Sequence, residues 1–78
     1  MRKRETRAIV AFYTTHDAMA FEDYCRTAGA EGRLIPLPKA ISADCGLAWS
    51  APPEDEEGLR RLLLEAGIEA QHVRKLEI

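Results

Sequence analysis

The 78-residue sequence lacks the features that mark membrane-spanning and nucleic-acid-binding proteins. No apolar run approaches the ~20 residues that a helix needs to cross a bilayer. The net charge of −2 at pH 7 gives no overall attraction to nucleic acid or to an anionic membrane. Only two cysteines are present, and aromatic residues make up 6% of the chain. We therefore expect partners other than nucleic acids and membranes.

The motifs of common cofactor sites are also missing. The sequence has no P-loop, no G-x-G-x-x-G, no C-x-x-C and no pair of carboxylates in a convincing pocket. A cysteine and a histidine alone fall short of the three or four ligands that a metal site usually has. The sequence therefore predicts no metal and no other cofactor, and it leaves open whether the protein is an enzyme.

The first seven residues, MRKRETR, carry four positive charges. We interpret residues 1–6 as a basic solvated tail, because a nucleic-acid contact would need basic residues spread along a face. Only about seven apolar-leaning residues follow before the polar TTHD, which is too few for a convincing signal peptide. These features favour a cytoplasmic protein whose cysteines are free thiols.

Hydrophobic periodicity divides residues 7–78 into strands and helices. Apolar residues on both faces of the first segment predict a central strand. The next segment predicts a helix with Thr14 or Thr15 as its N-cap and Gly29 as its end. The predicted elements, in order, are strand 7–14, helix 14–29, strand 31–38, strand 45–51, helix 52–67 and strand 68–78.

This β-α-β-β-α-β order folds most simply, with right-handed crossovers, into one ferredoxin-like domain over residues 7–78. Such an α+β sandwich has a four-stranded antiparallel sheet of order 4-1-3-2 with two helices on one face. The proline-containing second strand and the polar fourth strand then lie at the sheet edges. The other sheet face is left open, although the central strands are apolar on both sides. The simplest expectation is that a second copy of the chain covers this face in a homodimer. The next simplest is that a partner protein covers it.

The topology places Cys45, in the stretch ISADCGLAW, beside the start of the first helix. There, close to Thr14, Thr15 and His16, unpaired N–H groups and the helix dipole would stabilise a thiolate. Gly46 would allow a close approach of a partner, and the small residues before the cysteine would leave its sulfur uncrowded. An exposed nucleophile and a small residue tolerated at a loop-to-strand junction are both open interpretations.

Plainer interpretations apply to five other residues. Cys25 falls on the apolar stripe of the first helix, ~15 Å along the axis from its start, so we expect packing and no disulfide. Asp17 is interpreted as a partner of the helix dipole. Asp44 is interpreted as a turn former, although its carboxylate would disfavour a nearby thiolate. We expect His72 to be solvated and Trp49 to lie in the core.

Four short segments occur in a particular order along the chain. They are THDA at residues 15–18, RLIPLP at 33–38, IS at 41–42 and CGLA at 45–48. Together they resemble the DUF3343 family of selenium/sulfur carrier-like proteins, although Ala43 and Asp44 stand here where the family pattern has serines. The resemblance implies a carrier that holds sulfur or selenium as a persulfide or selenosulfide on one cysteine, which is Cys45 in this sequence. It also implies donor and acceptor proteins, such as a cysteine desulfurase.

Three functional hypotheses remain. The one we favour is a sulfur or selenium carrier, with Cys45 as the attachment residue, His16 and Thr15 supporting its thiolate, and Gly46 beside the substrate. The second is a small ligand-sensing or protein-interaction domain without thiol chemistry. The third is a metallochaperone-like binder that uses Cys45 and His16.

Overall fold

The computed structural model describes residues 4–78. In chain order its elements are β1 (Thr6–Phe12), α1 (Thr15–Ala28), β2 (Arg33–Pro36), β3 (Leu47–Ala51), the 3-10 helix η1 (Pro53–Asp55), α2 (Glu56–Ala66) and β4 (Ala70–Glu77). The strands form one antiparallel sheet in the order β2-β3-β1-β4. This is the predicted order 4-1-3-2 read from the other edge, so the ferredoxin-like α+β prediction is confirmed.

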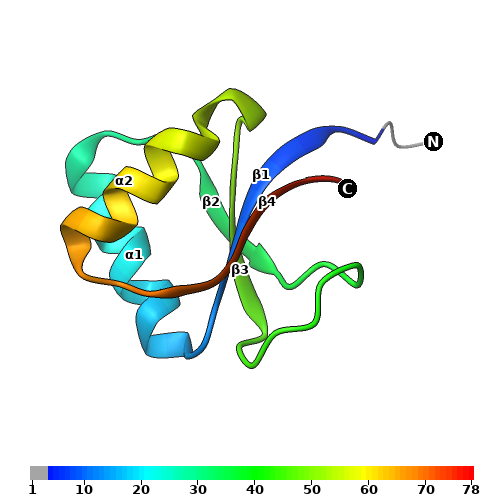
Figure 1. Cartoon of the computed structure of the whole chain (residues 1–78), viewed down its shortest axis with the longest axis horizontal. Coiled ribbons are helices and arrows are strands. Elements are labelled where there is room, and N and C mark those ends of the chain that lie inside the picture. The colour runs from blue at the N-terminus through cyan, green and yellow to red at the C-terminus, as the bar shows by residue number, and fades with distance from the viewer. Residues whose placement is uncertain (1–3) are drawn as a thin grey trace.

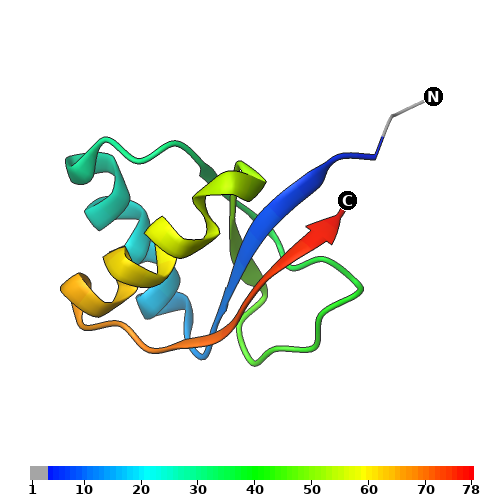
Figure 2. The same ribbon diagram turned by 45° about the horizontal axis from the view of Figure 1, so that its top comes forward.

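Both helices pack on one face of the sheet, as Figure 1 and Figure 2 show from two directions. Alternate residues of β1, including Phe12, face this helix layer together with Trp49 of β3. Phe21 of α1 lies between them, with ring centroids 5.7 Å from Phe12 and 5.9 Å from Trp49. Tilted and edge-to-face pairs of this kind are favoured aromatic geometries. Trp49 is therefore a core residue, as predicted.

The second predicted helix is divided into two parts. Pro53 begins the short 3-10 helix η1, and the regular α-helix starts only at Glu56. Proline has no N–H and a fixed φ, so the adjacent pair Pro52 and Pro53 favours a tight turn before the helix proper. α2 then buries Leu59 and Leu63, which belong to the core between the helices and the sheet.

The sheet begins slightly before the predicted domain boundary. β1 starts at Thr6, and Glu5 exchanges two backbone hydrogen bonds with Ile78, at 3.0 and 2.9 Å. Of the tail predicted over residues 1–6, the first three lie outside the described residues. The last two of its residues thus pair with the end of the chain.

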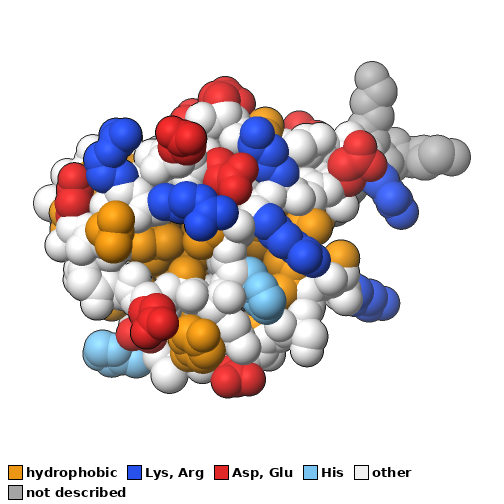
Figure 3. All heavy atoms as spheres, in the orientation of Figure 1, with side chains coloured by type: hydrophobic (Ala, Val, Ile, Leu, Met, Phe, Trp, Pro, Cys, Tyr) orange, Lys and Arg blue, Asp and Glu red, His pale blue; other side chains and the backbone are white. Residues whose placement is uncertain are grey.

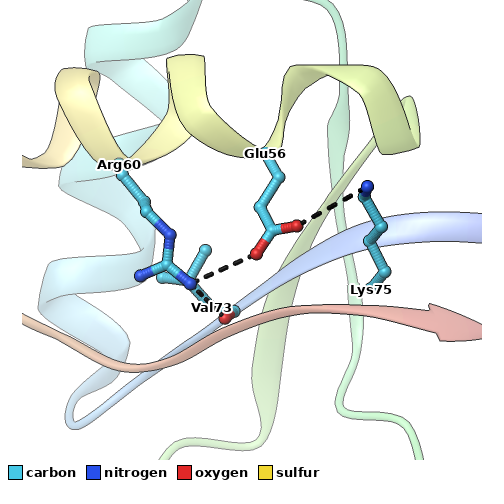
Figure 4. Close-up of polar contacts among 4 residues, drawn as sticks. All are labelled: Glu56, Arg60, Val73 and Lys75. Atoms are coloured by element: carbon cyan, nitrogen blue, oxygen red, sulfur yellow. Dashed lines mark hydrogen bonds and ion pairs between the residues drawn. The ribbon is translucent and has the colours of Figure 1, made fainter.

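Polar contacts fasten α2 to β4 (Figure 4). Arg60 Nη2 donates to the carbonyl oxygen of Val73 at 2.9 Å and to Glu56 Oε2 at 3.2 Å. Lys75 Nζ lies 3.9 Å from the other oxygen of Glu56. Because such partly exposed ion pairs contribute only ~0–1 kcal/mol each, they orient α2 more than they stabilise the fold.

The loop between β2 and β3, residues 37–46, folds over part of the sheet face that the helices leave open (Figure 1). Ile41 of this β2–β3 loop is 5% exposed and packs with Ile9, Ala11 and Ala48 of the sheet. Those three residues are fully buried. The apolar residues expected to need a second copy are therefore covered by the chain itself, and they give no support to a dimer through this part of the face.

Charged side chains of both signs lie next to one another over the face drawn in Figure 3, with hydrophobic side chains visible between them. The described part of that face thus carries no extended patch of one sign. Neither helix within residues 4–78 has the length and apolar character needed to cross a membrane.

Candidate functional site

The start of α1 is fixed by Thr14, one of the two residues predicted to cap it. Thr14 is extended (φ −137°, ψ 154°), and its Oγ1 accepts a hydrogen bond from the Asp17 N–H at 3.0 Å. Asp17 lies in the first turn, where a carboxylate interacts favourably with the helix dipole. α1 therefore presents a capped N-terminus with partial positive charge immediately after β1.

Cys45 lies beside this helix start. Its backbone N–H donates to the carbonyl oxygen of Phe12, the last residue of β1, at 3.3 Å. Its Sγ lies 3.7 Å from Oγ1 of Thr15, the first residue of α1. The structure thus brings Cys45 and Thr15 together, from positions 30 residues apart in the chain.

Two hydrogen-bonding groups surround the sulfur of Cys45. The backbone N–H of Leu47 donates to Sγ at 3.4 Å, and the Thr15 hydroxyl can donate from its 3.7 Å position. Both contacts suit a sulfur with negative charge, because a thiolate accepts hydrogen bonds and has no proton to give. The partial charge of the α1 N-terminus acts in the same direction. The arrangement therefore places two hydrogen-bonding groups and the start of α1 around the Cys45 sulfur.

Cys45 is buried, which corrects the expectation of an exposed and uncrowded thiol. The residue is 3% exposed and belongs to the same core cluster as Phe12, Ala18 and Trp49. The physical reason is the position of Cys45 just before β3: the hydrogen bond from its backbone N–H to the Phe12 carbonyl holds it against the core that contains Phe12 and Trp49.

Gly46, in contrast, is exposed. Apart from the glycine itself and its two chain neighbours, no atom lies within 4 Å of the position that a Cβ would occupy there. Its carbonyl oxygen accepts a hydrogen bond from the Leu37 N–H at 2.9 Å, which ties the two ends of the β2–β3 loop together. The space next to the backbone of Cys45 is therefore open on this side.

His16 is not brought into contact with the sulfur. Its side chain is 90% exposed, and its Nδ1 lies 3.9 Å from Asp17 Oδ1. A supporting role of His16 for the thiolate stays a prediction. Within residues 4–78, no three His, Cys, Asp or Glu side chains gather as metal ligands, so a metal site built on Cys45 and His16 has no geometric support.

Side chains of β4 hold the β2–β3 loop through three hydrogen bonds that the sequence pattern did not predict. His72, expected to be solvated, instead contacts the loop. The hint in the sequence is the run QHVR at residues 71–74, which was interpreted only as a polar edge. The three hydrogen bonds are Gln71 Oε1 with the Asp44 N–H (2.9 Å), His72 Nε2 with the Ser42 carbonyl (3.0 Å) and Arg74 Nη2 with the Ala40 carbonyl (3.2 Å).

Asp44 is exposed, while the neighbouring Cys45 is in the core. Its backbone N–H is bound by Gln71, so the residue serves to anchor the loop. Because an exposed charge is screened by water and salt, the Asp44 carboxylate opposes an anionic sulfur less than the sequence alone suggested.

Cys25 has a different environment. It is fully buried on α1, and burial raises the pKa of its thiol to about 11. Both cysteines are free. Among the described residues, hydrogen-bond donors contact the sulfur of Cys45 and none contacts that of Cys25. Cys25 is thus the packing residue that was predicted, and Cys45 is the candidate for chemistry.

Comparison with known proteins gives one match, to a family of proteins. The sequence model of a family described as "Putative Se/S carrier protein-like" matches residues 7–74. The match includes the start of α1, the β2–β3 loop and Cys45. The comparison with curated proteins found no match, and neither did the comparison with solved structures.

Proposed function

The chain belongs to the family of Se/S carrier-like proteins, and from this premise we propose that it carries sulfur or selenium on Cys45. The atom would be held as a persulfide or selenosulfide between a donor and an acceptor protein. The observation that carries the proposal is the pair of hydrogen-bonding groups at the Cys45 sulfur, at the start of α1.

Loading Cys45 needs no oxidant when the donor is itself a protein persulfide. The Cys45 thiolate attacks the terminal sulfur of the donor, so a new S–S bond forms as the donor's S–S bond breaks. The donor cysteine leaves as a thiolate, and the terminal sulfur keeps its proton. One thiolate and one S–S bond stand on each side, so the step is redox-neutral. Unloading is the same reaction with an acceptor thiolate, and selenium can replace the terminal sulfur.

The environment of Cys45 supports the anionic states of this cycle. Thr15 and the Leu47 N–H face the sulfur before loading, when it must be a thiolate to attack. Cys25 is less suited to this role, because burial raises its pKa and so disfavours its thiolate at neutral pH. The two cysteines are therefore divided between chemistry and packing.

Transfer to another protein requires the β2–β3 loop to open, because Cys45 is 3% exposed. The loop is held to β4 by hydrogen bonds with the side chains of Gln71, His72 and Arg74. Hydrogen bonds contribute ~0.5–1.5 kcal/mol each, so opening this loop costs less than unfolding the domain.

The burial of Cys45 also favours a second function, an interaction domain without thiol chemistry. In that case the sulfur would only fill space beside Phe12 and Trp49. Loading distinguishes the two functions, because a space-filling thiol would accept no sulfur.

The test is incubation with a cysteine desulfurase and free cysteine, followed by intact mass measurement. The wild-type chain and Cys25→Ala should each gain one sulfur atom, and Cys45→Ala should gain none. Equal gain by Cys45→Ala, or no gain by the wild-type chain while a known acceptor is loaded in parallel, would contradict the carrier function.

A further inference from the structure

A shallow groove crosses the part of the non-helical sheet face that the β2–β3 loop leaves uncovered. Its volume is about 850 Å³, within the ~300–1,000 Å³ range of ligand pockets. Three arginines line it: Arg4, Arg7 and Arg33. Ile35, Pro36 and Ile78 supply apolar surface beside them. We refer to this surface as the arginine groove.

The charge of the arginine groove differs from that of the whole chain. Among its lining residues the single acidic side chain is Glu5, against three arginines, whereas the chain has a net charge of −2. Within residues 4–78, the ion pairs involve Arg26, Arg60, Lys75 and His16, and none involves an arginine of the groove. These guanidinium groups are therefore available for an anionic partner.

A buried serine lines the groove and binds one of its arginines. Ser50 is 3% exposed, and its Oγ accepts a hydrogen bond from Arg7 Nε at 3.0 Å. The terminal nitrogens of Arg7 make no hydrogen bond within the described chain. Arg33 is the cross-strand partner of Ser50 in the β2–β3 ladder. Arg7 and Arg33 thus flank Ser50 from the two strands on either side of β3.

We propose that the arginine groove docks an acidic, extended segment of a partner protein. Guanidinium groups pair with carboxylates in a bidentate geometry, and Ile35, Pro36 and Ile78 can receive apolar side chains from the same segment. The lining contains no aromatic residue on which a nucleic-acid base could stack. A small inorganic anion would leave the apolar part of the groove unused.

The arginine groove and Cys45 lie on opposite sides of the sheet, since Cys45 packs with the helix-facing core. A docked segment therefore lies on the sheet face opposite the sulfur, and it reaches the β2–β3 loop only at Pro38. The docking proposal does not depend on sulfur chemistry, and Cys45→Ala should bind the segment as the wild-type chain does.

The probe is a fluorescein-labelled hexapeptide of alternating leucine and glutamate, and binding is followed by fluorescence anisotropy at low and high salt. The same peptide with glutamine in place of glutamate is the matched control. The glutamate peptide should bind at least about fivefold more tightly at low salt and lose this advantage at high salt.

Two arginine substitutions locate the binding. Arg33→Ala should weaken binding about two- to fivefold, and the further change Arg7→Ala should weaken it again by a similar factor. Arg61→Ala removes an exposed charge on α2 away from the groove and should leave affinity unchanged. The proposal would be overturned if the two peptides bound equally, or if Arg61→Ala lost as much affinity as Arg33→Ala. It would also be overturned if inorganic phosphate at an equal concentration displaced the peptide.

Discussion

Replacement of Gln71 by alanine should speed the reaction of Cys45 with a small alkylating reagent. Gln71 Oε1 holds the backbone N–H of Asp44, the residue immediately before Cys45. Without this bond, the β2–β3 loop keeps its contacts with His72 and Arg74. The loop should therefore open more often while the sheet and the helices stay folded.

The size of the effect follows from the loss of one hydrogen bond. A bond that contributes ~0.5–1.5 kcal/mol changes an opening equilibrium by about 2- to 13-fold. If the loop recloses faster than the reagent reacts, the alkylation rate rises by the same factor. Because the Gln71 bond is exposed, we expect an increase of about threefold, near the lower end of that range.

The assay is timed reaction with iodoacetamide under native conditions, followed by digestion with trypsin and mass spectrometry. Cys25 and Cys45 fall in separate tryptic peptides, residues 8–26 and 40–60, so each rate is measured in the same sample. Glu69→Ala, an exposed change two residues before Gln71, is the control. An unchanged Cys45 rate in Gln71→Ala would refute the reasoning. So would equal acceleration at Cys25, because that would mean global unfolding.

Three further predictions concern stability, measured by urea denaturation with the fluorescence of the single tryptophan. Gly32→Ala should lose ~3 kcal/mol, because its Cβ would lie 2.7 Å from the Trp49 ring and 2.8 Å from the Ser50 carbonyl oxygen at φ +149°. A loss below ~1 kcal/mol would contradict this geometry. Thr14→Ala removes the N-cap and should lower the free energy of unfolding by ~1 kcal/mol. Thr14→Ser keeps a capping hydroxyl and should retain most of this stability, so equal losses in the two variants would argue against capping. Burial raises the pKa of Cys25 from its ordinary value of 9.0 to about 11. As pH rises through this window the unfolded chain loses a proton that the folded chain keeps, so stability should fall, and the fall should be smaller in Cys25→Ala, where the raised pKa of Tyr24 still contributes.

The topology could be predicted from the sequence because local signals and global arrangement agree. Thr14 and Gly29 mark the two ends of α1, and the structure places the cap and the left-handed C-cap at these residues. Pro36 removes a backbone donor from β2, which accordingly lies at the sheet edge. Trp49 was expected in the core and lies there.

The cover of the second sheet face could not be predicted, because it depends on contacts between distant residues. The β2–β3 loop has no regular hydrophobic period, and its two large apolar residues, Leu37 and Ile41, are separated by Pro38, Lys39 and Ala40. Its burial requires Ile9 and Ala48, and its anchoring requires Gln71, 27 residues beyond Asp44. The surroundings of Cys45 depend on the same loop. The location of the cysteine therefore followed from topology, whereas its burial did not.

The most direct test of the account is to locate the sulfur delivered by a cysteine desulfurase within the wild-type chain. After loading, the remaining thiols are blocked, the chain is digested with trypsin, and the peptides containing Cys25 and Cys45 are weighed. The account predicts one added sulfur atom on the peptide of residues 40–60 and none on that of residues 8–26. Sulfur on the Cys25 peptide, or on neither peptide while a known acceptor is loaded, would contradict it.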